Sequence, residues 1–108
     1  MINEKYKILP YDVVEAGLNL EYIGRFEYAW KKDEIIIILK ILGEKGIPVL
    51  GGDIYKIIDG RVESTYDSWF INNDGASDFV ERSLDKAISY IEKYEHINGD
   101  EYVYALVF

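Results

Sequence analysis

Cysteine is absent from this 108-residue chain, and histidine occurs once, at His96. Without cysteine there is no thiol nucleophile and no disulfide, and a single histidine removes nearly every zinc-ligand pattern. We therefore expect neither a bound metal nor a cofactor. Because 49% of the residues are hydrophobic, the chain can build a core without such staples, and residues 1–108 are expected to form one domain.

Long apolar stretches are also missing. The longest run, from Ile35 to Leu42, is interrupted by Lys40 and is too short to cross a bilayer. Residues 1–6 lack the apolar segment of a signal peptide. The sequence therefore predicts a cytoplasmic protein without a membrane partner.

Positive charge is scarce in the second half of the chain. The net charge is −8, and residues 51–108 contribute −7 of it, with five basic and twelve acidic side chains. Such a surface repels nucleic acid and attracts a basic protein. The same charge also fits an acidic protein that needs no partner.

The clearest structural signal is the Asp59-Gly60 pair between two strand-forming runs. A two-residue Asp-Gly loop favours a β-hairpin because both positions accept a positive φ. The resulting register starts with Ile58 opposite Arg61 and would place Asp53 opposite Tyr66. It predicts a solvated face around Lys56 and Glu63. The other, packed face would carry Val49, Asp53, Tyr55, Ile57, Val62, Ser64 and Tyr66.

A helix is predicted from Glu34 to about Glu44, between the aromatic-rich segment 22–30 and the hairpin. Asp33 could cap it and Gly46 could end it, although the four isoleucines at 35–38 would also suit a strand. The class of segment 22–30 stays open, and Trp30 is expected to lie in the core.

A longer amphipathic helix is predicted over 78–96, with Asp78 as its cap and Glu81 reaching back to it. The aromatic and β-branched run at 101–108 predicts a final strand that joins the hairpin. We therefore expect an α+β fold, in which a small antiparallel sheet of the hairpin and the C-terminal strand packs against two or three helices.

The predicted register sends a carboxylate, Asp53, toward the packed side. A buried carboxylate needs a partner, so Asp53 is predicted to be a structural residue that pairs with Tyr66 or Trp69. Alternatively, Asp53, Tyr66 and Asp67 could line the pocket of a small enzyme or ligand-binding domain, with the two carboxylates as an acid–base pair. The preceding glycines are expected to permit a bulge or close backbone approach within the strand.

Two motifs and part of the long helix resemble a known family. The motifs are Gly51-Gly52-Asp53, within 47–55, and Tyr66-Asp67-x-Trp69, within 65–70. The helix contributes Ser83, Ala87, Tyr90, Ile91 and Tyr94. With these residues the chain resembles, over residues 30–108, bacterial polymorphic-toxin immunity proteins, in particular immunity protein 40. Ser68 and Phe70 depart from the family's asparagine and tyrosine.

The resemblance implies a cytoplasmic, non-catalytic protein that binds one cognate toxin domain and blocks it. It also marks as the structural motif of the domain Gly51, Gly52, Asp53, Tyr55, Tyr66, Asp67 and Trp69.

If the chain is such an immunity protein, we expect a basic toxin, bound by the acidic second half beside the exposed face of the hairpin. The acidic candidates for partner binding are Asp74, Asp78, Glu81, Asp85 and Glu92. The candidate aromatic anchors are Tyr66, Trp69 and Phe70. An acidic interaction protein without a toxin partner stays open as a further alternative.

Overall fold

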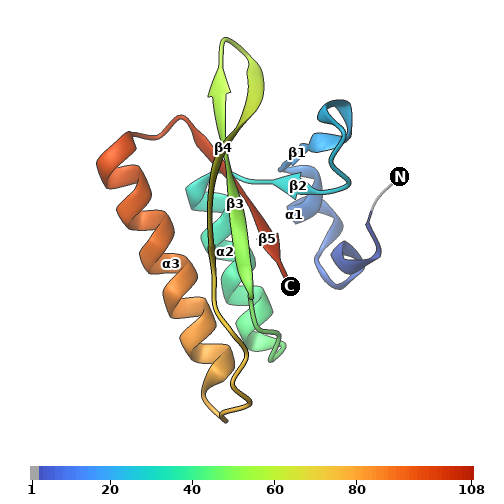
Figure 1. Cartoon of the computed structure of the whole chain (residues 1–108). Helices are drawn as coiled ribbons and strands as arrows, with labels where there is room; N and C mark the ends of the chain where they lie inside the picture. Colours follow the sequence, from blue (N-terminus) through green and yellow to red (C-terminus); the bar gives the residue numbers. More distant parts are fainter. Residues whose placement is uncertain (1–2) are drawn as a thin grey trace.

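A three-stranded antiparallel sheet carries two helices on one face in the computed structural model, which describes residues 3–108 (Figure 1). The strand order is β4-β3-β5, and β1 and β2 form a separate two-stranded sheet. The predicted α+β fold is therefore confirmed. The elements are η1 (Glu4–Ile8), α1 (Tyr11–Glu15), β1 (Leu18–Asn19), η2 (Leu20–Ile23), β2 (Tyr28–Ala29), α2 (Lys32–Glu44), β3 (Gly51–Ile58), β4 (Arg61–Phe70), α3 (Phe79–Asn98) and β5 (Tyr102–Val107).

The β3–β4 hairpin turns at the predicted pair, where Asp59 has φ 50° and Gly60 has φ 78°. The predicted register holds from the turn to the pairing of Tyr55 with Ser64. It then breaks, because Asp53 lies opposite Ser68 and not opposite Tyr66. A bulge in β4 thus displaces Tyr66 from the ladder.

Helix α2 forms despite its run of isoleucines because every third or fourth residue meets the core. Ile35, Ile38, Leu39 and Leu42 are its buried residues. The predicted cap is wrong, since Lys31 occupies the N-cap position and no side chain caps the helix. Gly46, with φ 70°, follows the end of the helix as predicted.

Helix α3 buries Phe79, Ser83, Ala87 and Ile91, which recur four residues apart. Asp78 takes the N-cap position, but its side chain makes no cap hydrogen bond, so the predicted capping box is wrong. Ser83 anchors the helix to the start of the sheet: its Oγ accepts from the backbone N–H of Val49 (3.0 Å) and donates to the carbonyl of Val80 (2.8 Å).

Both faces of the sheet are covered, which the hairpin alone did not predict. The face of Lys56, expected to be solvated, also carries Ile54 and meets α2 and α3 in the main core. Tyr55 and Val62 are buried as expected, but they pack against Leu20 and Ala29 of the N-terminal segment. Figure 1 shows this segment, and helices α2 and α3, on opposite sides of the sheet. Trp30 lies in the main core as predicted.

Within residues 3–108, no helix has both the length and the apolarity that a membrane crossing requires.

Candidate functional site

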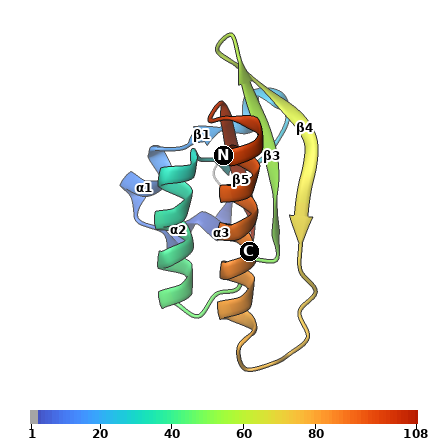
Figure 2. The ribbon, with the colours of Figure 1, turned by 90° about the vertical axis from the view of Figure 1, so that its left-hand side faces the viewer.

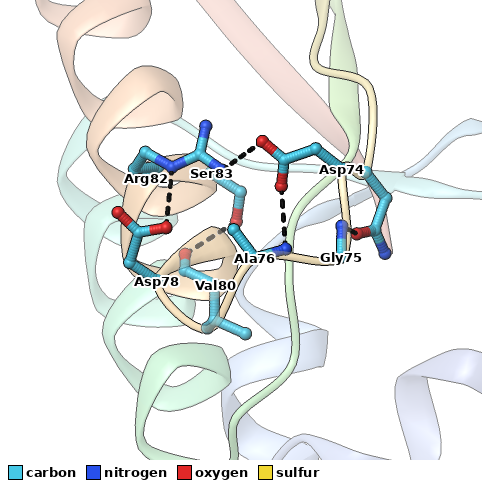
Figure 3. Close-up of polar contacts among 8 residues, drawn as sticks. Asp74, Gly75, Ala76, Asp78, Val80, Arg82 and Ser83 are labelled. Atoms are coloured by element: carbon cyan, nitrogen blue, oxygen red, sulfur yellow. Dashed lines mark hydrogen bonds and ion pairs between the residues drawn. The ribbon is translucent and has the colours of Figure 1, made fainter.

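Two of the acidic candidates form ion pairs with one arginine at the start of α3 (Figure 3). Arg82 Nη2 lies 2.6 Å from Asp74 Oδ2, and Arg82 Nε lies 3.1 Å from Asp78 Oδ1. The backbone N–H of Ala76 also donates to Asp74 Oδ1 (3.0 Å). Donation from Ala76 and then from Arg82 lowers the pKa of Asp74, and the two carboxylates in turn raise the pKa of Arg82. Asp74 and Asp78 are thus already paired within the chain.

The other three acidic candidates form what we call the free carboxylate row: Glu81, Asp85 and Glu92. All three are exposed, and none makes an ion pair or side-chain hydrogen bond with another residue of the described chain, 3–108. Spacings of four and seven residues at about 100° per residue place them on one edge of α3. This row is available to a cation from outside the chain.

The row borders a groove between α2 and α3, which we call the helix groove. It has a volume of about 690 Å³, and Glu81 and Asp85 are among its lining residues. Its apolar lining consists of Ile36, Leu39, Val80, Leu84 and Ile88. The acidic row therefore lies beside an apolar hollow.

The same geometry corrects the predicted position of the acidic surface. Basic residues occupy the edge of α3 that faces β4: Lys86 Nζ donates to the carbonyl of Phe70 (2.7 Å), and Arg82 holds the loop after β4. The free carboxylate row lies beyond them, toward α2. The expectation that the acidic residues lie beside the exposed face of the hairpin is therefore wrong for Glu81 and Asp85, which line the groove on the side of α2.

Trp69 is buried in the core, so its prediction as an aromatic anchor for a partner is wrong. Its side chain is only 5% exposed, and its ring stacks on that of Tyr90 with a centroid distance of 5.0 Å. Opposite it in the ladder lies Gly52, whose missing side chain leaves room for the ring. The close approach predicted for the glycine pair is therefore present, and it serves to bury Trp69.

Tyr66 and Phe70, in contrast, are exposed on β4. Tyr66 is 91% exposed and has φ 64°, a left-handed conformation that a tyrosine rarely adopts. Side chains hold the bulge in place: Ser64 Oγ accepts from the Tyr66 N–H (3.1 Å), and Thr65 Oγ1 donates to the Ile54 carbonyl (2.8 Å). The fold thus supports a strained residue whose side chain contributes almost nothing to the core.

Replacing Tyr66 tests whether its conformation carries strain. We expect the Tyr66→Gly variant to be more stable than the Tyr66→Ala variant by about 1 kcal/mol, because glycine accepts a positive φ and alanine does not. Neither change removes much buried surface. The free energy of unfolding in urea measures the difference, and equal stabilities would show that the bulge is unstrained.

The residues proposed for an enzyme pocket are not brought together. The Asp53 side chain is half-buried and makes no hydrogen bond or ion pair with a residue in 3–108, so its predicted pairing with Tyr66 or Trp69 is wrong. Its charge instead acts on Lys5. Burial lowers the pKa of Lys5, and the negative charges of Glu27 and then of Asp53 partly oppose this shift.

Asp67 points to the other side of the sheet, toward α3. Its Oδ2 accepts from the Tyr94 hydroxyl (2.8 Å). Burial, and then this hydrogen bond, raise the pKa of Tyr94 to about 12. Asp53 and Asp67 therefore cannot act as a carboxylate pair in this arrangement.

The apolar residues of the helix groove were missed in the sequence. Ile36 and Ile88 belong to apolar faces wider than one core-facing stripe needs, and that width was a usable signal.

The comparisons with known proteins identify a family. The family model of Immunity protein 40 matches residues 19–108, most of the chain. No curated protein and no solved structure matches it. The match spans all of β3, β4, α3 and β5, and so includes the buried Trp69, the Tyr66 bulge and the free carboxylate row. The chain therefore belongs to the Immunity protein 40 family.

Proposed function

We propose that this protein is a cytoplasmic, non-catalytic inhibitor that protects its own cell by binding a basic toxin domain. Family membership supplies the class of function. The observation that carries the finer claim is the free carboxylate row, because three exposed acidic side chains without partners in residues 3–108 are ready to meet a cationic surface. Charge complementarity speeds association and rejects wrong partners.

The separation of Asp53, Tyr66 and Asp67 also favours binding over the enzyme alternative. Acid–base catalysis needs its groups within reach of one substrate. Here Tyr66 lies beside Arg25 and Ile23 on the side of the sheet away from the helices, while Asp67 contacts α3. Tyr66 and Asp67 therefore lie on opposite sides of the sheet.

Tyr66 and Phe70 stay candidate anchors for a partner. They lie on β4, separated from the free carboxylate row by Arg82 and Lys86. A toxin that used both surfaces would have to reach around this basic edge. The acidic row is therefore the simpler first contact.

Reversing charge in the row is expected to slow association. In the Glu81→Lys/Asp85→Lys double variant, the association rate constant for the cognate toxin domain, which we expect to be encoded beside this gene, should fall roughly tenfold at low salt. The salt dependence of that rate should also become weaker, because fewer attractive charges are left to screen. Surface plasmon resonance from roughly 50 to 500 mM salt measures both effects.

A matched control changes the net charge equally at the other end of α3. Asp100→Lys/Glu101→Lys alters two exposed acidic residues that lie roughly 20 Å or more from Asp85, beyond the screening length of about 10 Å. This variant should associate nearly as fast as the unmutated protein. Equal rates for all three proteins would move the interface away from the row. No binding by the unmutated protein would instead favour an acidic interaction protein without a toxin partner, or the enzyme alternative.

A further inference from the structure

The helix groove lies between two helices that run antiparallel side by side (Figure 2). Along α2 its lining extends from Ile36 to Glu44 and continues to Gly46 in the turn that follows. At 1.5 Å per residue this part of α2 is roughly 13 Å long, about two and a half turns of a helix. Two helices that lie side by side leave a straight groove between their rows of side chains. A third helix can pack into such a groove.

The bottom of the groove is lined by apolar side chains that the core buries only in part. Ile36, Leu84 and Ile88 pack against the main core and are nevertheless only partly buried, so their outer surfaces line the groove. Leu84 and Ile88 are one turn apart on α3. An apolar face that stays accessible in this way can bind the apolar face of another helix.

Gly43 helps to keep the groove open. A Cβ added at this position would lie 2.6 Å from Leu84 Cδ1. Any side chain here would therefore displace the end of the Leu84 side chain, which also lines the groove. Glycine in the interior of α2 costs about 1 kcal/mol of helix stability relative to alanine, so the open groove comes at the expense of local stability.

The charges around the groove are mostly negative. Glu44, Glu81 and Asp85 line it and have no ion-pair partner in residues 3–108, whereas Lys40 is the one cation among its lining residues. Asp78 also lines it but is paired with Arg82. An occupant with lysine or arginine beside an apolar stripe would match both the floor and the rim.

We propose that the helix groove receives an amphipathic α-helix of the toxin domain. Its apolar face lies on Ile36, Leu84 and Ile88, and its basic side chains meet Glu44, Glu81 and Asp85. This inference rests on the proposed function and assigns the binding energy to the groove, while the free carboxylate row sets the association rate.

Because the chain has no cysteine, single cysteines can report on the groove without background. Ile36→Cys places a thiol in the lining, and Ile37→Cys places one on the adjacent, 56% exposed residue, which does not line the groove. Both variants are mixed with the purified toxin domain. The rate at which maleimide labels the cysteine of this chain is measured by mass spectrometry. Binding should slow labelling of Ile36→Cys at least about tenfold and leave Ile37→Cys within about twofold.

A photo-crosslinker on the Ile36→Cys thiol then identifies the toxin segment in the groove. The cross-link is expected to map to one helix with lysine or arginine beside its apolar face. A cross-link to a loop or strand would overturn the proposal. Unchanged labelling of Ile36→Cys in a complex that still forms would also overturn it. So would slow labelling of Ile36→Cys in the free protein that is caused by self-association. In each of these cases the proposed function stands, whereas failure of both variants and of the unmutated protein to bind the toxin would count against the function itself.

Discussion

Replacing Trp30 by alanine is expected to lower the free energy of unfolding by about 4 kcal/mol, enough to threaten a small domain. The indole is fully buried, stacks on Tyr28 at a centroid distance of 5.9 Å and meets the edge of Tyr6 at 5.7 Å. Its Nε1–H donates to the carbonyl of Val13 (2.9 Å), which ties the N-terminal segment to the core. Chemical unfolding followed by circular dichroism measures the loss.

A second aromatic residue nearby in the chain serves as control for this change. Phe26 is 69% exposed, so Phe26→Ala should shift stability by less than about 0.5 kcal/mol. A Trp30→Phe variant keeps an aromatic ring but removes the donor to Val13, and it should fall between the two. If Trp30→Ala costs no more than Phe26→Ala, Trp30 does not organise the core as described.

Adding a single methyl group at Gly52 is expected to destabilise the domain by about 3 kcal/mol. In the Gly52→Ala variant the new Cβ would collide with the ring of Trp69 and lie 2.7 Å from the Ala105 carbonyl oxygen. The strand backbone is held on both sides by β4 and β5, so it cannot move away easily. The urea concentration at the midpoint of unfolding should fall, and the near-ultraviolet circular dichroism of Trp69 should change.

Gly43→Ala is the matched control, because it adds the same atom where only the flexible end of Leu84 is in the way. The gain in helix propensity should offset this contact, and the stability should stay within about 1 kcal/mol of the unmutated protein. Combining Gly52→Ala with Trp69→Leu should recover part of the lost stability, since the smaller side chain removes the collision. No recovery in that double variant would show that the clash with Trp69 is not the cause.

Local signals in the sequence were enough for the main elements. The Asp59-Gly60 turn was predicted correctly because positive φ at both positions is a property of the turn itself. The amphipathic pattern of α3 and the aromatic run of β5 were also sufficient, since each element buries one face against a neighbour.

Features that depend on distant partners could not be predicted in this way. Trp69 looked like a possible anchor, but Gly52 and Tyr90, from two other elements, decide that it is buried. The register failed at Tyr66 because a tyrosine gives no signal for a left-handed backbone.

The acidic surface shows the same limit. The sequence gives the spacing of the acidic residues on α3 but not their partners. Pairing with Arg82 removed Asp74 and Asp78 from the free carboxylates, and the packing of α2 against α3 placed Glu81 and Asp85 beside a groove. The Asp78–Arg82 pair is an i,i+4 contact that the spacing alone could have indicated. The pairing of Asp74 with Arg82 and the position of the groove depend on contacts that no local pattern encodes.

Titrating the activity of a cognate toxin domain, which we expect to be encoded beside this gene, with the purified protein tests the central claim most directly. The account predicts that toxin activity falls linearly and reaches its minimum at one equivalent of this protein, as expected for a tight stoichiometric inhibitor. Full toxin activity in the presence of excess protein would contradict binding as the function. Complete loss of activity at a small fraction of one equivalent would contradict a non-catalytic mechanism.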